Sequence, residues 1–173
     1  KSKNLVIAGG SALNCVANGK IMKGSGYKNI FVPPVPDDSG AGLGAALYVN
    51  NSINKEKKRI NLFNNFLGPS YKNNEILEEL RKFKIKYEYF DNIEKQAVDS
   101  ILQGKIIAWF QGSLEFGDRA LGNRSILADP RNKDIKDKIN KSIKYREAFR
   151  PFAPAILEEK VSDFFENAQT SYY

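Results

Sequence analysis

Cationic side chains gather in two short stretches of the chain, EFGDRALGNRSILADPR (115–131) and KYREAFRPFAP (144–154). These cations are Arg119, Arg124, Arg131, Lys144, Arg146 and Arg150. Apolar residues and prolines surround them, so the stems of several should be packed rather than solvated. A partly buried guanidinium group needs an anionic partner.

That partner could belong to the protein or to a ligand. Glu115, Asp118, Asp129 and Glu147 could form internal ion pairs with the arginines. Alternatively, the surplus cations could bind phosphate groups through charge-assisted hydrogen bonds. Nucleic acid is a third possibility, but the basic residues are embedded in apolar sequence, and Arg-Gly and RNP-like signatures are missing. Spacing alone leaves internal pairs and phosphate binding both open.

Two other groups of residues in the first part of the chain could do chemistry. Gly9, Gly10 and Asn14 follow a short apolar run. A strand–Gly-Gly–helix turn offers backbone amides to a phosphate, although ordinary turn geometry explains it too. Asp37 and Asp38 precede SGAGLGAA, where an aspartate either caps a helix or ligates a hard metal ion.

Composition excludes several kinds of chemistry. The 173 residues contain no histidine, so there is no His-based triad, HExxH zinc site or imidazole base. Cys15 is the single cysteine, which excludes an internal disulfide and favours a reducing compartment. The net charge of +7 suits phosphorylated partners, but a solvated lysine-rich surface explains it as well. With no apolar run near about 20 residues and no visible signal peptide, we expect a cytoplasmic protein without a membrane partner.

An α/β order of elements would position these groups. Strands are expected at residues 5–8, 29–32, 86–90, 105–110, 125–129 and 152–157. Helices are expected at 11–24, 40–53, 74–84, 92–105 and 133–143. The polar segment near residues 55–70 contains Gly68-Pro69 and is typical of a domain boundary.

Four motifs, taken in order, resemble a known family. They are GGSALNCVANGK (9–20), FVPPVPDDSGAGLGAAL (31–47), EFGDRALGNRSILADPR (115–131) and INKSIKYREAFRPFAPAIL (139–157). Together they resemble the C-terminal half of the O-carbamoyltransferases, which include nodulation protein U and antibiotic-tailoring carbamoyltransferases. The resemblance implies an α/β (α+β) chain. Residues 1–62 would end an actin/hexokinase-like ATPase domain, and 63–173 would begin a mixed-sheet domain like threonylcarbamoyl-AMP synthase.

The resemblance also implies an activity. In the family, carbamoyl phosphate is activated with ATP to give carbamoyl adenylate and pyrophosphate. The carbamoyl group then moves to a hydroxyl of a sugar, nodulation factor or antibiotic. The implied partners are ATP, carbamoyl phosphate and a small hydroxylated acceptor, without nucleic acid, and a dimer remains an open alternative. The implied cofactors are Mg²⁺ with ATP, and iron or another divalent metal.

Site residues carry over from the matching motifs. Asp38 corresponds to a metal ligand of the family, and Arg119 and Lys144 correspond to its catalytic cations. The remaining residues implied to bind ATP or carbamoyl phosphate are Gly9, Gly10, Asn14, Arg124, Arg146 and Arg150. Lys144 and Arg146 form a Lys-x-Arg pair like the triphosphate-binding pair of the synthase fold. Cations suit this chemistry because charge develops on the phosphates during adenylation.

The chain departs from the family pattern at several points. Asp118 stands where the family usually has proline. The His-x-x-x-His metal ligands of the family are absent, and its Ser-x-Asn triphosphate motif would follow further downstream. We therefore expect an internal piece of the enzyme, inactive in isolation, or a family member that is split or degenerate. The alternative is a non-catalytic phosphate- or nucleotide-binding module that completes a partner's site.

Overall fold

The computed structural model describes residues 2–58, 60, 62 and 64–166. The chain divides into two units. The first contains the chain up to Ser70 together with Ser113–Leu121. The second contains Tyr71–Gly112 and the described residues from Gly122 to Glu166. Each unit is described by itself.

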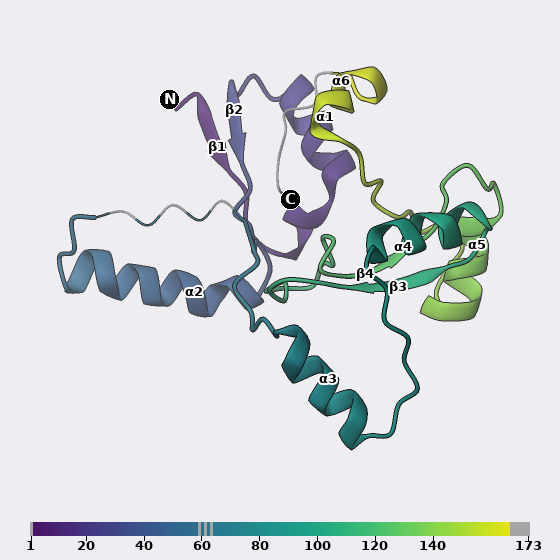
Figure 1. The fold of residues 1–173 in the computed structure, drawn as a ribbon. Coiled ribbons are helices and arrows are strands. Elements are labelled where there is room, and N and C mark those ends of the chain that lie inside the picture. The colour runs from purple at the N-terminus through teal and green to yellow at the C-terminus, as the bar shows by residue number, and fades with distance from the viewer. Residues whose placement is uncertain (1, 59, 61, 63, 167–173) are drawn as a thin grey trace. The chain divides into compact units, whose positions relative to one another are not determined.

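The first unit is built around a short parallel pair of strands (Figure 1). β1 (Asn4–Val6) pairs with β2 (Asn29–Phe31), with Leu5 opposite Ile30. A 3₁₀ turn (Gly10–Leu13) and α1 (Cys15–Gly24) connect them. A loop over residues 32–38 contains Pro33, Pro34 and Pro36 and is called the proline loop. α2 (Ser39–Tyr48) follows it and continues into a π-helical turn over Val49–Ile53.

Local sequence explains how α1 begins and where this unit buries its core. The Asn14 side chain caps α1 by accepting a hydrogen bond from the Ala17 amide at 3.0 Å. Ala12 in the 3₁₀ turn and Val35 and Pro36 in the proline loop are the buried apolar residues described in this unit. Val16, in the first turn of α1, is 62% exposed.

The second unit combines short helices with an antiparallel hairpin. Its helices are α3 (Asn73–Lys82), α4 (Ile93–Leu102), α5 (Ile135–Ile139) and α6 (Val161–Phe164). A π-helical turn (Asn140–Lys144) extends α5, and a 3₁₀ turn (Glu158–Lys160) precedes α6. β3 (Ile107–Phe110) pairs with β4 (Arg124–Leu127), placing Phe110 opposite Arg124.

The expected helices of this unit at 74–84, 92–105 and 133–143 are confirmed, as are the strands at 105–110 and 125–129. The strands expected at 86–90 and 152–157 were wrong, because these residues form neither helix nor strand. Pro154 interrupts the latter segment, and proline cannot donate to a strand ladder. The sheet was expected to be mixed, whereas the strands described in this unit pair antiparallel.

At the level of class, a mixture of helices and small sheets agrees with the expected α+β fold. The ATPase-like and synthase-like folds, and the domain boundary between residues 62 and 63, stay predictions. No helix in the described part of the chain is both long and apolar enough to cross a membrane.

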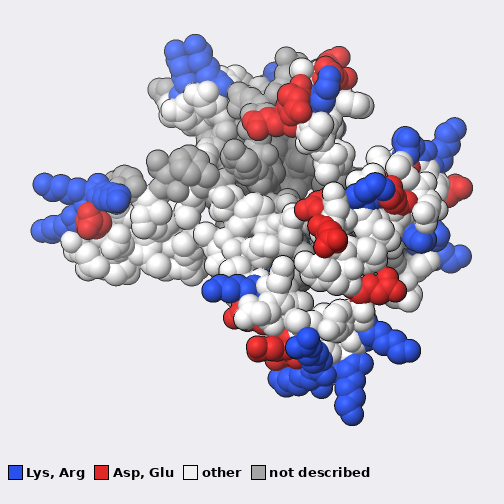
Figure 2. Space-filling model, in the orientation of Figure 1, with Lys and Arg blue, Asp and Glu red and all other residues white. Residues whose placement is uncertain are grey.

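Charged side chains of both signs lie on α3 in the second unit. Figure 2 shows basic and acidic side chains intermixed over α3, whose sequence NNEILEELRK carries both signs. Lys82 and Glu79 form an exposed ion pair there at 3.1 Å. This helix is a solvated surface of the kind that explains part of the lysine content.

The connection between β3 and β4 is the unusual feature of the topology. The hairpin closes at its base, where the Gln111 amide donates to the Asn123 carbonyl at 2.9 Å. The intervening Ser113–Leu121 segment belongs to the first unit. The first cationic motif therefore contributes to both units.

Candidate functional site

The proline loop before α2 is held by close backbone contacts. The Gly9 amide donates to the Pro36 carbonyl at 2.6 Å. A Cβ atom on Gly40 would collide with the Val35 carbonyl, so α2 can begin here only with glycine at this position. The Gly-Gly turn and the first turn of α2 thus fix the loop that carries Asp37 and Asp38.

The two aspartates of this loop have different surroundings. Asp37 is half-buried, and its Oδ1 accepts a hydrogen bond from the Ser39 amide at 2.7 Å. Asp38 occupies the residue before α2 but makes no side-chain capping bond, and it is exposed. The capping alternative proposed from sequence therefore applies to Asp37, while the Asp38 carboxylate remains open to solvent.

The pKa of Asp37 reflects this difference. Desolvation raises the pKa, but hydrogen bonds from Ser39 and from the backbone amides of Asp37 and Asp118 outweigh it. The net pKa lies below the ordinary value for aspartate. Asp37 is therefore ionised at neutral pH, with the Ser39 amide as a hydrogen-bond donor to its carboxylate.

The Ser113–Leu121 segment is bound to the first unit by backbone hydrogen bonds. The Phe116 amide donates to the Asn65 carbonyl at 2.7 Å, and the Asn65 side chain donates back to the Phe116 carbonyl at 3.3 Å. Leu114 exchanges backbone bonds with Gly68 and Pro69, each at 2.9 Å. Asn65 is only 1% exposed, so this junction is tightly enclosed.

Gly117 brings this segment against the aspartate loop. Its φ of +109° is a conformation that favours glycine. A Cβ atom there would lie 3.1 Å from Val35 Cγ1 and 3.6 Å from Asp37 Oδ2. The Glu115 carboxylate, buried to 8% exposure, accepts from the Leu121 amide at 2.7 Å and closes the turn around Arg119.

Several cations in the second unit are engaged by the protein itself. The Arg124 guanidinium lies 3.5 Å from the centre of the Phe110 ring and donates to the carbonyls of Gln111 and Gly112. Arg131 binds Asp129, with an Nη2–Oδ2 distance of 2.6 Å. Neither arrangement requires a ligand to satisfy the guanidinium group.

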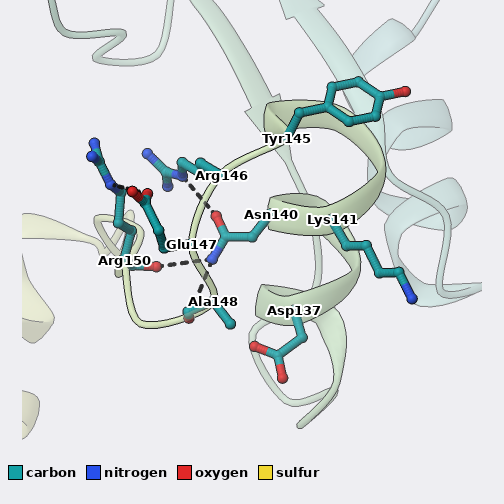
Figure 3. A pocket seen from close by; sticks show the side chains of 8 residues that line it. All are labelled: Asp137, Asn140, Lys141, Tyr145, Arg146, Glu147, Ala148 and Arg150. Atoms are coloured by element: carbon teal, nitrogen blue, oxygen red, sulfur yellow. Dashed lines mark hydrogen bonds and ion pairs between the residues drawn. The ribbon is translucent and has the colours of Figure 1, made fainter.

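The second cationic motif folds back around Asn140, which is 1% exposed (Figure 3). The Asn140 Nδ2 donates to the Arg150 carbonyl at 3.0 Å and the Ala148 carbonyl at 3.4 Å. Its Oδ1 accepts from Arg146 Nε at 2.7 Å. A pocket opens beside this loop, lined by Asp137, Asn140, Lys141, Tyr145, Arg146, Glu147, Ala148 and Arg150.

Both arginines of this loop have protein partners. Arg146 also donates to the Pro151 carbonyl at 3.3 Å, and its guanidinium lies 4.5 Å from the centre of the Phe152 ring. Arg150 pairs with Glu147 at 2.8 Å, as Figure 3 shows. That pair is half-exposed on both sides, so it can open for a ligand at small cost.

Arg119 and Lys144 differ from the other cations of the two motifs. Both are exposed, and among the described residues neither side chain has a hydrogen bond or ion pair. Arg119 lies in the first unit, as do Gly9, Gly10, Asn14 and Asp38. Lys144 lies in the second unit with Arg124, Arg146 and Arg150.

The donor set for a metal ion is incomplete within the described residues. They contain no group of three histidine, cysteine or acidic residues that could hold one. The Asp38 carboxylate is exposed and makes no helix-capping hydrogen bond, so it fits the role of one hard oxygen ligand. Any site it joins must draw further ligands from elsewhere.

Comparison with known proteins shows the family to which the chain belongs. Residues 1–47 match the family model described as carbamoyltransferase N-terminus, and 98–173 match carbamoyltransferase C-terminus. The chain belongs to the carbamoyltransferase family. The resemblance recognised in the sequence motifs is thereby confirmed.

Individual carbamoyltransferase relatives align along nearly the whole chain. Nodulation protein NolNO of Sinorhizobium fredii is 44% identical over 95% of the chain and 25% of its own length. Nodulation protein U of Rhizobium fredii is 33% identical over 95% of the chain and 26% of its own length. The 3'-hydroxymethylcephem-O-carbamoyltransferase of Streptomyces clavuligerus is 30% identical over 93% and 29%. The chain thus spans less than a third of these relatives.

The structure also identifies carbamoyltransferase residues that the motifs alone did not single out. From the sequence, Asp37 was considered only together with Asp38. An aspartate whose side chain can accept a hydrogen bond from the backbone amide two residues later is, however, a recognisable turn signal. Asn140 lies inside a quoted motif, but its burial depends on the loop folding back onto it. The contact of Gly117 with Val35 joins segments far apart in sequence, and no local pattern indicates it.

Proposed function

We propose that the chain is part of an O-carbamoyltransferase that activates carbamoyl phosphate with ATP as carbamoyl adenylate. The carbamoyl group would then pass to a hydroxyl of a small acceptor. Family membership supports carbamoyl transfer in general. The named activity of the cephem O-carbamoyltransferase relative supports a hydroxyl oxygen as acceptor.

The observation that carries the proposal is the contrast among the motif cations. Arg124, Arg131, Arg146 and Arg150 are bound by carbonyls, carboxylates, an amide oxygen or aromatic rings. Arg119 and Lys144 are exposed, and the described residues offer their side chains no partner. Cationic side chains that have no anionic partner within the protein are suited to bind phosphate.

The proposed reaction balances as follows. A water oxygen attacks the phosphorus of carbamoyl phosphate, and the products are carbamate and inorganic phosphate. A carbamate oxygen attacks the α-phosphorus of ATP, and pyrophosphate leaves. The acceptor hydroxyl oxygen attacks the carbamoyl carbon, the bond to AMP breaks, and the hydroxyl proton passes to a base. Arg119 in the first unit and Lys144 in the second would each neutralise charge on a bound phosphate group.

Two metal ions would contribute to this chemistry when bound. Mg²⁺ accompanying ATP would shield the phosphate charges, and iron or another divalent metal at Asp38 would act as a Lewis acid. Asp38 would supply a carboxylate oxygen to that metal, with the other ligands provided outside these residues. Gly9, Gly10 and Asn14 would line the nucleotide pocket of the first unit.

Replacement of Lys144 by alanine tests the phosphate-binding role. Lys144→Ala should weaken binding of ATP or carbamoyl phosphate by about tenfold or more, because a charge-assisted hydrogen bond contributes about 1.5–3 kcal/mol. Calorimetric titration of the 173-residue chain with each ligand separately measures this. Lys138→Ala removes an equal charge from exposed α5 and should leave affinity unchanged. Equal affinity of Lys144→Ala and the unsubstituted chain would refute the assignment.

A second measurement separates the enzyme from a binding module. A longer protein that contains this chain should exchange labelled pyrophosphate into ATP only when carbamoyl phosphate is present. Ligand binding without exchange would favour the alternative, a non-catalytic nucleotide- or phosphate-binding module. That alternative is kept because the chain spans only a part of its relatives.

A further inference from the structure

We propose that Asn140 is a positioning residue that orients the Arg146 guanidinium at the pocket beside its loop, where this cation binds a phosphate group of ATP or carbamoyl phosphate. The inference rests on the proposed function, in which cations of the two motifs bind phosphate groups. It gives a buried asparagine, which need not touch the ligand, a role in ligand binding.

The first support is that neutral groups hold the Arg146 guanidinium. Its Nε donates to Asn140 Oδ1 at 2.7 Å, which is the shortest of its contacts. Its Nη2 donates to the Pro151 carbonyl at 3.3 Å, and the centre of the Phe152 ring lies 4.5 Å from the guanidinium. Two edge contacts and one face contact define the plane of the group, but none of them carries a negative charge. A cation that is oriented but not neutralised is suited to an anionic ligand.

The paired arginines of the two motifs are held differently. Arg131 binds the Asp129 carboxylate at 2.6 Å, and Arg150 binds the Glu147 carboxylate at 2.8 Å. The charge of each is therefore balanced within the chain. Arg146 forms no ion pair with any residue that the structure describes, and its acidic neighbour Glu147 pairs with Arg150 instead.

The Asn140 side chain can serve as a support because it is fixed on its other side as well. It is 1% exposed, and its Nδ2 donates to the carbonyls of Arg150 at 3.0 Å and Ala148 at 3.4 Å (Figure 3). These two bonds use both amide hydrogens, so Oδ1 is the atom that faces the Arg146 donor. A buried side chain bonded at both ends keeps the guanidinium in one orientation.

The backbone brings Arg146 within reach of Asn140. Tyr145 has a φ of +47°, in the left-handed region that residues other than glycine seldom occupy, and it ends the π-helical turn. The Arg146 amide then donates to the Asn140 carbonyl at 3.1 Å. Arg146 is thus attached to Asn140 through its backbone and its side chain, and both residues line the pocket.

Ligand affinities of four variants of the 173-residue chain test the inference. They are Asn140→Ala, Arg146→Ala, the double variant of these two, and the control Ile139→Val. ATP and carbamoyl phosphate are titrated separately by calorimetry, so the source of the bound phosphate group is distinguished. Arg146→Ala should weaken at least one ligand by about tenfold or more, and Asn140→Ala should weaken the same ligand by about fivefold.

The double variant and the control separate positioning from general damage. The double variant should bind no more weakly than Arg146→Ala, because Asn140 acts through that guanidinium. Ile139 is buried next to Asn140, and its replacement by valine removes no hydrogen-bond partner of Arg146. Ile139→Val should therefore bind as the unsubstituted chain does. Weakening of Ile139→Val as large as that of Asn140→Ala would overturn the inference, since general damage would then explain both.

NMR of the arginine side chains covers the case in which Asn140→Ala fails to fold. In the unsubstituted chain, the Arg146 Nε–H should exchange with water more slowly than that of Arg81, by about fivefold or more. Arg81 is exposed on α3, and its side chain has no partner among the described residues. The Arg146 signal is identified by its loss in Arg146→Lys. Equal exchange rates at the two arginines would overturn the inference.

Failure of the inference and failure of the proposed function give different results. If Arg146→Ala weakens binding but Asn140→Ala does not, or if the losses add in the double variant, the inference alone is wrong. If Arg146→Ala binds both ligands normally, or the unsubstituted chain binds neither, the phosphate role of Arg146 is wrong and the inference falls with it. Lys144→Ala tests the proposed role of Lys144 separately, because the described residues offer that side chain no partner.

Discussion

Asp129 and Arg131 show at the scale of single residues how a motif cation is taken up by its own chain. Arg131 donates through both Nε and Nη2 to the Asp129 carboxylate. The side-chain hydrogen bond from Arg131, with its backbone amide and charge, lowers the pKa of Asp129 to about 2. The pair is a local clamp after β4, and it satisfies this guanidinium group within its own chain.

The Asp129–Arg131 pair predicts that the folded chain loses stability as the pH falls through the acid range. The pKa of Asp129 is about 2 in the folded chain against 3.8 ordinarily. Its contribution to stability is therefore present above the ordinary value and is lost as the pH falls toward 2. NMR titration of the carboxyl carbon should show the low pKa, and Arg131→Ala should raise it toward 3.8. Lys133→Ala should leave it low; a low pKa in Arg131→Ala would contradict the assigned cause.

The motifs predicted which residue types gather but not which cations would be satisfied internally. Arg124 stacks on Phe110 because the register of β3 and β4 places these residues opposite each other. Arg146 meets Asn140 because its loop folds back. Both outcomes depend on tertiary pairing, which spacing in one sequence does not encode. For this reason, internal pairs and phosphate binding were both left open from sequence.

At the scale of elements, Asn140 determines the shape of the loop that follows α5. Its side chain makes bonds to two carbonyls and one guanidinium while almost fully buried. Asn140→Ala should lower the free energy of unfolding by about 1–3 kcal/mol, because buried partners lose their bonds. Urea denaturation followed by circular dichroism measures this. Lys141→Ala, on the exposed side of the same turn, should change it by less than about 0.5 kcal/mol.

Helices of the second unit were predictable because their capping and periodic signals are local. Glu75 accepts from the Lys72 amide at the start of α3, and Asn92 caps α4 through the Lys95 amide. The segments at 86–90 and 152–157 have strand-like composition but form no strand. A strand depends on a neighbour that composition does not specify. For the same reason, the sequence did not indicate that Ser113–Leu121 belongs to the first unit.

At the scale of the whole molecule, the two units are interleaved along the chain rather than consecutive. A polypeptide of residues 1–70 lacks the segment that binds Asn65 and Gly68 and places Gly117 next to Val35 and Asp37. Adding a synthetic peptide of residues 113–121 should shift the amide NMR signals of Ser39 and Gly68 in this polypeptide. A peptide with Gly117→Ala should bind more weakly, because the added methyl meets Val35. Identical spectra with and without the first peptide would contradict this docking.

Because part of the β3–β4 connection belongs to the first unit, that unit can be completed only late in synthesis. Ser70 emerges from the ribosome well before the segment that completes its own unit. At about 5–20 residues per second, the intervening stretch of about 50 residues takes about 3–10 s to make. During this delay the backbone groups of Asn65 and Gly68 have no partner from that segment. The nascent first unit therefore depends on later sequence to complete its fold, and a chaperone that holds it meanwhile would raise the yield of folded protein.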